Sequence, residues 1–167
     1  MGSEYGRAAV VQMVSGDVVA DNLRDARGWV DSAAEQGAGL VVLPENFAFL
    51  GGHERAALAA GEPDGVGPIQ DFLAGTAQRL GITLVGGSVP MHGDEPDRVR
   101  SACLVYGPDG RRIARYDKRH LFDVSLPGGE GYRESATFAP GDDIVVADTP
   151  AGRLGLSICY DLRFPEH

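Results

Sequence analysis

A chain of 167 residues with 43% hydrophobic and 23% charged residues has the size and composition of one globular domain. Its formal net charge of −9 argues against a nucleic-acid-binding surface, because such surfaces need clustered lysines and arginines to neutralise phosphates. No apolar run is long enough to span a bilayer, and the N-terminal stretch lacks the basic and apolar parts of a signal peptide. We therefore expect a cytoplasmic protein with neither a nucleic-acid nor a membrane partner.

No linker, low-complexity segment or internal repeat divides the chain, so residues 1–167 are predicted to form one domain. The two cysteines, Cys103 and Cys159, are isolated in the sequence. Neither belongs to a Cys-x-x-C motif, and no histidine lies at ligand spacing from them. The sequence thus predicts no zinc site, no disulfide framework and no cofactor.

The first half of the chain alternates strand and helix patterns. Residues 7–14 are predicted to be a buried strand, residues 21–36 a helix closed by Gly37, and residues 40–45 a second strand. A second helix is predicted to begin at Pro68 and to end at Gly81. The expected buried face of the first helix comprises Leu23, Ala26, Trp29, Val30 and Ala33.

The second half of the chain has strand patterns separated by turns. Strands are predicted over residues 82–90, 101–107 and 111–118, with a turn at 108–110 that makes the last two a hairpin. Within the first of these strands, Gly86 and Gly87 indicate close packing or a bulge. A further strand pair surrounds residues 150–152, and its second strand is predicted to end at Cys159. An α/β fold with a mixed sheet follows.

Three residues with reactive side chains follow predicted strands: Glu45, Lys118 and Cys159. In open α/β sheets such positions converge in the crevice beyond the carboxyl ends of the strands. The structural alternative is a solvated acid, a surface cation and a small buried hydrophobe. Spacing alone leaves both interpretations open.

The segments around these residues favour the first interpretation. "LPEN", "RYDKRHLFDV" and "SICYDLRFPE" resemble, in this order, the Glu, Lys and Cys motifs of the nitrilase (carbon–nitrogen hydrolase) superfamily. The Cys-Tyr-Asp sequence, together with "HLFDVSLPGG" and "YRESATFAPGD", is most similar to the Nit branch, which includes omega-amidases and amidases of deaminated glutathione. The resemblance implies a four-layer α-β-β-α sandwich, of which residues 1–167 would be an incomplete N-terminal portion, and a homodimer or larger homo-oligomer.

The resemblance also implies roles for individual residues in hydrolysing a small-molecule amide. Cys159 would be the nucleophile, at a strand-to-helix turn where the positive helix end lowers its pKa. Glu45 would be the general base and acid. Lys118 and the backbone N–H of Tyr160 would stabilise the oxyanion. Glu134 would position the lysine or the substrate, although Glu130 lies close to it in sequence.

Several alternatives remain at this stage. His120 could form a Cys–His dyad, although the resemblance supplies Glu45 as the base. Asp161, Arg163 and Glu166 fit structural salt bridges better than catalysis. At the level of the protein, the alternatives are another hydrolase of the superfamily, such as a carbamoylase, nitrilase or glutaminase module, or a non-catalytic remnant that needs a partner chain.

Overall fold

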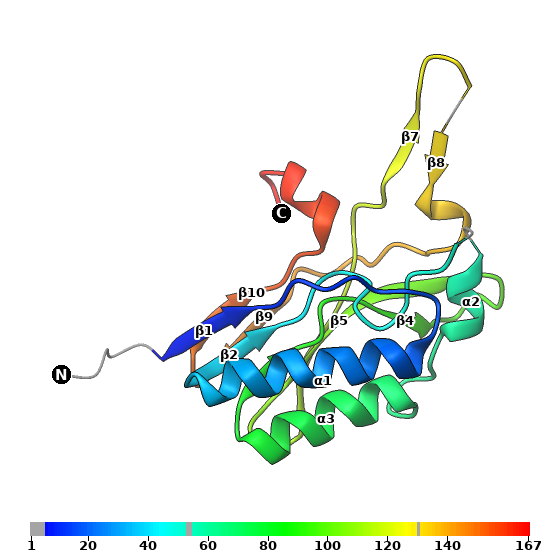
Figure 1. Cartoon of the computed structure of the whole chain (residues 1–167). Helices are drawn as coiled ribbons and strands as arrows, with labels where there is room; N and C mark the ends of the chain where they lie inside the picture. The colour runs from blue at the N-terminus through cyan, green and yellow to red at the C-terminus, as the bar shows by residue number, and fades with distance from the viewer. Residues whose placement is uncertain (1–5, 53–54, 130) are drawn as a thin grey trace.

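The computed structural model describes residues 6–52, 55–129 and 131–167 (Figure 1). The helices are α1 (Val19–Glu35), α2 (Ala56–Ala60) and α3 (Pro68–Leu80), and two 3₁₀ turns are η1 (Glu134–Ala136) and η2 (Cys159–Arg163). The strands are β1 (Arg7–Val10), β2 (Ala38–Val42), β3 (Thr83–Val85), β4 (Val89–His92), β5 (Val99–Tyr106), β6 (Arg112–Asp117), β7 (Asp123–Ser125), β8 (Gly131–Arg133), β9 (Val146–Thr149) and β10 (Gly152–Gly155). None of the helices in this described part of the chain is long and apolar enough to cross a membrane.

A mixed sheet forms the centre of the fold, as predicted. Among the described residues it has six strands in the order β1-β2-β3-β5-β4, and β6 pairs with the other edge of β5. Strands β1, β2 and β3 are parallel, whereas β5 is antiparallel to β3, β4 and β6. Strands β2 and β6 therefore run in the same direction, and their carboxyl ends lie on the same side of the sheet.

The two faces of the sheet carry separate apolar clusters because successive strand side chains point to opposite faces. Val41, Leu84 and Leu104 pack with buried side chains of α1 and α3, which lie side by side against one face (Figure 1). Leu40, Val85, Cys103 and Val105 belong to the second cluster, on the opposite face, with Leu156 and Ile158. The segment that leads to Cys159 thus covers the face that the helices leave open.

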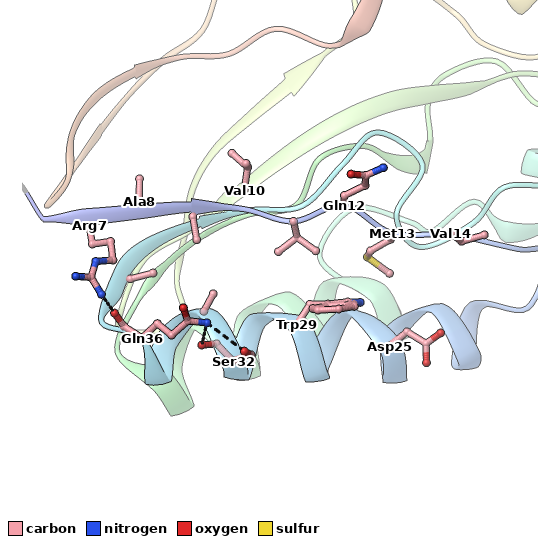
Figure 2. A pocket seen from close by; sticks show the side chains of 14 residues that line it. Arg7, Ala8, Val10, Gln12, Met13, Val14, Asp25, Trp29, Ser32 and Gln36 are labelled. Atoms are coloured by element: carbon pink, nitrogen blue, oxygen red, sulfur yellow. Dashed lines mark hydrogen bonds between the residues drawn. The ribbon is translucent and has the colours of Figure 1, made fainter.

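Helix α1 confirms the predicted helix but not all of its predicted buried face. Ala26 and Val30 are fully buried, whereas the Trp29 side chain is 56% exposed. Trp29 lies at the flank of the helix, in a groove of about 830 Å³ between α1 and the segment Arg7–Val14 (Figure 2). The predicted strand is present over Arg7–Val10 as β1, but it ends before residue 14 and is not buried, with Val10 85% exposed.

Helix α3 begins and ends as the sequence predicts. Pro68 occupies its first turn, and Gly81 closes it in the left-handed conformation with a φ of 64°. The buried Glu62 carboxylate accepts hydrogen bonds from the backbone N–H groups of Ile69 and Gln70, at 2.6 and 3.2 Å. These bonds satisfy donors that the helix start leaves unpaired.

The strand predicted over residues 82–90 is divided into β3 and β4, which pair with successive parts of the same edge of β5. The division lies at Gly86–Ser88. Gly87 has a φ of 37°, and a Cβ atom there would overlap the carbonyl oxygens of Leu43 and Pro44. The predicted close packing is therefore confirmed, and it brings the chain just before Glu45 against the sheet.

Three further elements differ from the sequence prediction. Helix α2 and the hairpin β7–β8, which projects from the body of the fold in Figure 1, lie in segments for which the sequence predicts neither a helix nor a strand. The last strand, β10, ends at Gly155 and not at Cys159. Three residues lie between it and Cys159, and two of them, Leu156 and Ile158, belong to the second apolar cluster.

The contact at Gly87 generates a stability prediction. Gly87→Ala should lower the free energy of unfolding by about 2–4 kcal/mol, because the new methyl group meets backbone atoms and the left-handed conformation disfavours alanine. The matched control is Gly75→Ala in α3, where a Cβ atom would meet nothing within 4 Å. That change should stabilise the protein by about 0.5–1 kcal/mol. Urea denaturation followed by circular dichroism measures both, and equal effects of the two variants would contradict the account.

Candidate active site

Glu45 and Lys118 both lie beyond the carboxyl ends of strands of the central sheet. Glu45 is three residues beyond β2, and Lys118 directly follows β6. Because β2 and β6 run in the same direction, both side chains emerge where the strands end. The two side chains converge as predicted, with Lys118 Nζ 3.0 Å from Glu45 Oε1.

The Lys118 ammonium group is buried between two carboxylates. Its Nζ atom lies 3.0 Å from Glu45 Oε1, 2.9 Å from Glu134 Oε1 and 3.0 Å from Glu134 Oε2. Only 2% of the Lys118 side chain and 7% of the Glu134 side chain are exposed, against 31% for Glu45. Glu45 is therefore the member of this trio that faces the open side of the site.

The carboxylates keep Lys118 charged. Burial of the ammonium group lowers its pKa, but the attraction of Glu45 and Glu134 outweighs this effect, and the net pKa of Lys118 is raised. Glu134 is itself fixed, since its Oε2 atom accepts the backbone N–H of Phe122 at 2.6 Å. Of the two glutamates that the sequence offered for this place, Glu134 is in contact with Lys118, and Glu130 lies outside the described residues.

The loop that carries Glu45 is anchored to the sheet on both sides. Before Glu45, the carbonyl groups of Leu43 and Pro44 pack against Gly87. After it, Asn46 adopts a φ of 56°, and its backbone N–H donates to Ser88 Oγ at 2.8 Å. The glycine and serine between β3 and β4 therefore hold the loop in place.

Cys159 opens the 3₁₀ turn η2 with its thiol accessible. Its φ of 47° lies in the left-handed region, which non-glycine residues rarely adopt and which is frequent at functional sites. The residue is exposed, unlike Cys103, whose burial raises its pKa to about 12. The two cysteines are thus clearly different in reactivity, since a thiol must be accessible and able to ionise in order to react.

The expected lowering of the Cys159 pKa by a helix end is wrong. Its pKa is raised, first by partial burial of the thiol and then by the nearby carboxylate of Glu45, while Lys118 acts in the opposite direction. The turn η2 has only five residues, so it cannot supply the dipole of a full helix. The thiol therefore carries its proton next to a carboxylate that can accept it.

Aromatic rings line one side of the Cys159 turn. The Tyr160 ring makes edge-on contacts with Phe122 and Phe164, at centroid distances of 5.0 and 5.3 Å. Phe122 also packs against Tyr132 of β8. The structure thus positions the Tyr160 side chain, whereas the oxyanion role of its backbone N–H stays a prediction.

Asp161 and His120 form a separate, mostly buried cluster. His120 Nδ1 lies 2.7 Å from Asp161 Oδ1, and the His120 ring stacks on Phe164 with centroids 3.7 Å apart. Among the described residues, the charged groups that act on the Cys159 thiol are Glu45, Lys118 and Glu134, so the structure gives no support to a Cys159–His120 dyad. Asp161 has the structural role that was expected of it. The Tyr116 hydroxyl also belongs to this cluster, since it donates to Asp161 Oδ2 at 2.5 Å, and no sequence pattern indicated this contact.

This cluster is also the one group in the described part of the chain whose side chains could hold a metal ion. Ligand atoms of His120, Asp161 and His167 lie within 4.8 Å of one another. However, both Asp161 oxygens already accept hydrogen bonds from protein donors. The cluster is therefore explained as a hydrogen-bond network.

A cavity of about 340 Å³ lies next to the loop after Glu45. Asn46 and Tyr132 line it, together with the apolar or small residues Phe49, Leu50, Gly51, Gly52, Ala57 and Phe138. A volume of this order accommodates a small ligand. None of these lining residues is charged.

Comparison with known proteins places these features in a family. The carbon-nitrogen hydrolase family matches residues 7–167. The chain is 42% identical over 166 residues to a deaminated glutathione amidase of Synechocystis sp., covering 95% of this chain and 59% of that protein. It is 41% identical over 164 residues to omega-amidase NIT2 of Danio rerio, covering 96% of this chain and 56% of that protein. The chain thus spans somewhat more than half the length of these relatives.

A solved structure shares the fold. It is a mutant of the amidase from Nesterenkonia sp. AN1, which shows the result of Michael addition of acrylamide at the active-site cysteine of that enzyme. The TM-score is 0.78 at 30% identity, with 95% of this chain and 59% of that chain covered. The fold is thus an α/β fold of the nitrilase type, and the chain belongs to the carbon-nitrogen hydrolase family.

Proposed function

We propose that the protein is a thiol amidase that hydrolyses a small linear carboxylic amide to a carboxylic acid and ammonia through a thioester on Cys159. The observation that carries this proposal is that one carboxylate, Glu45, lies 3.0 Å from the Lys118 ammonium group and close enough to the Cys159 thiol to raise its pKa. Family membership and the amidase names of its relatives support the reaction class.

In the first half of the reaction, Glu45 acts as a general base and takes the proton of Cys159 as the sulfur attacks the amide carbon. The raised pKa of the thiol fits this order of events, because the proton leaves the sulfur during the attack rather than before it. The tetrahedral intermediate then breaks its carbon–nitrogen bond. Glu45 returns the proton to the nitrogen, and ammonia departs. The acyl group remains bound to the sulfur as a thioester.

In the second half, water attacks the thioester while Glu45 accepts a proton from it. The carbon–sulfur bond breaks, the sulfur regains a proton, and the carboxylic acid is released. Glu45 can exchange protons with both the thiol and water because it is the partly exposed member of the trio.

Lys118 has the electrostatic role in this proposal. Its ammonium group and the backbone N–H of Tyr160 would stabilise the oxyanion of each tetrahedral intermediate, which a buried positive charge does well because little water screens it. Glu134 contacts the ammonium group through both carboxylate oxygens. Its side chain is buried and does not face the open side of the site. Glu134 is therefore assigned as a positioning residue for Lys118.

The substrate class is proposed from the relatives and the cavity. The monoamides of small dicarboxylic acids and deaminated glutathione are the substrates that the relatives' names suggest. The cavity beside Asn46 would hold the acyl chain, and its lining is uncharged, so neutral amides belong in the same assay. N-carbamoyl amino acids and nitriles distinguish the carbamoylase and nitrilase alternatives. A homo-oligomer and a cytoplasmic location stay predictions.

The first prediction of this mechanism concerns the nucleophile. In the protein as its gene encodes it, Cys159→Ala should abolish ammonia release from the preferred amide, because no other group in the proposal can form the acyl intermediate. Cys103→Ala is the matched control, since Cys103 is buried in the second apolar cluster. It should keep turnover within about threefold of wild type, because it removes no group that acts in the reaction. Retained turnover in Cys159→Ala would disprove the assignment.

The second prediction concerns the general base. Glu45→Gln preserves the shape of the side chain but cannot accept the thiol proton, so kcat should fall by at least about a hundredfold. Glu35→Gln, at the exposed C-terminal end of α1, makes the same chemical change away from the site and should leave kcat unchanged. Steady-state ammonia release measures both variants. A loss of less than about tenfold in Glu45→Gln would show that another group is the base.

A further inference from the structure

The buried carboxylate of Asp161 joins two segments of the chain that are far apart in sequence. Its side chain is fully buried, and each of its oxygens accepts two hydrogen bonds. Oδ2 accepts the backbone N–H of Ile158 at 2.9 Å and the hydroxyl of Tyr116 at 2.5 Å. Oδ1 accepts the backbone N–H of His120 at 2.9 Å and its Nδ1 atom lies at 2.7 Å.

These donors flank the two residues whose relative position the chemistry requires. Ile158 immediately precedes Cys159, and Tyr116 and His120 lie two residues before and after Lys118. The Tyr116 hydroxyl also accepts the backbone N–H of Arg119 at 3.2 Å. A single carboxylate thus ties the turn that carries the thiol to the strand end that carries the ammonium group.

Two observations indicate that this tie is strong. Burial raises the pKa of Asp161, but the hydrogen bonds from Tyr116, Ile158 and His120 outweigh it, so the net pKa is lowered and the group stays ionised. Hydrogen bonds to an ionised acceptor are stronger than those between neutral groups. The Cys159 backbone, with its φ of 47°, also needs fixed neighbours to keep a conformation that non-glycine residues rarely adopt.

We infer that Asp161 is a positioning residue of the amidase site: its carboxylate fixes the distance between the Cys159 thiol and the Glu45–Lys118 pair. This inference rests on the proposed function for its effect on turnover, but not for its effect on the thiol. Asp161 touches neither Cys159 nor Lys118 through its side chain. It acts through the backbone on either side of them.

The substitution Asp161→Asn tests this role with little change in shape. The amide has one oxygen and one NH₂ group, whereas a backbone N–H donates to each carboxylate oxygen. Whichever way the amide is turned, the N–H of Ile158 or the N–H of His120 faces another donor. One of the two segments is therefore released.

The first measurement is the rate of Cys159 alkylation by iodoacetamide as a function of pH, which requires no amidase activity. The charged groups that act on the thiol are Glu45 after β2, Lys118 after β6 and Glu134 in η1. In wild type, partial burial and the two glutamates raise the pKa of the thiol, Lys118 lowers it, and the net pKa is raised. In Asp161→Asn we expect the midpoint of the profile to fall toward that of an unconstrained thiol, about 8.5, because the thiol moves away from Glu45.

The second measurement is the steady-state kinetics of the same variant. We expect kcat to fall by about tenfold or more at a KM within about threefold of wild type, because reacting groups are displaced while the acyl pocket is intact. Asp109→Asn is the matched control: this exposed carboxylate also accepts a backbone N–H, that of Arg111 at 3.0 Å, but in the turn between β5 and β6. It should change neither measurement.

The outcomes separate the two proposals. A folded Asp161→Asn protein with the wild-type alkylation profile and, on an active wild-type background, wild-type kcat would overturn the inference. A shifted profile in a protein that hydrolyses none of the amides would support the inference and count against the proposed function. If Asp161→Asn fails to fold, Tyr116→Phe combined with His120→Ala removes two side-chain donors and keeps both backbone bonds. This double variant should lower the alkylation midpoint, and an unchanged profile in it would overturn the inference.

Discussion

The burial of one ammonium group between two carboxylates is the constraint on which the site depends. An unpaired charge at the position of Lys118 would cost several kcal/mol, so the fold must bring Glu45 and Glu134 to it from other segments. Glu134 supplies a buried partner with both oxygens, and Glu45 supplies one oxygen and keeps part of its surface open. The same contacts that neutralise the buried charge leave one carboxylate free to meet the thiol. The same arrangement therefore neutralises the buried ammonium group and positions Glu45 as the base for the thiol.

The rest of the fold fixes the segments that carry these groups. The parallel course of β2 and β6 brings Glu45 and Lys118 to one edge of the sheet. Gly87 lets the chain before Glu45 approach the sheet, and Ser88 holds the residue after it. Leu156 and Ile158 dock the Cys159 segment on the face opposite the helices, while Asp161 connects it to the end of β6. Each segment is held by a contact that tolerates little change, which is how a scaffold keeps reacting groups within the small distances that catalysis requires.

Much of this arrangement could be predicted from the sequence, and the failures have physical causes. The helix over residues 68–80 follows from its proline, glycine and apolar spacing. The convergence of Glu45 and Lys118 follows from strand ends, whereas Cys159 was indicated by motif resemblance, since its strand ends earlier, at Gly155. Sequence periodicity could not show that Trp29 and Val10 are exposed, because burial depends on what packs against a surface. It could not show the break at Gly87, since the cause is a carbonyl group 43 residues earlier in the chain (87 − 44). The pKa of Cys159 was predicted in the wrong direction because a helix dipole was expected where a five-residue turn and a facing carboxylate are found.

The most direct test of the central claim is to detect the acyl group on Cys159 during turnover. The wild-type protein is mixed with its preferred amide, quenched in acid within the first turnover, and digested with trypsin, which releases residues 154–163 as one peptide. The account predicts that this peptide gains the mass of the acyl group, that the added mass is lost on treatment with hydroxylamine, and that the adduct disappears once substrate is exhausted. Turnover without any acyl adduct on this peptide, or with the adduct on another residue, would contradict it.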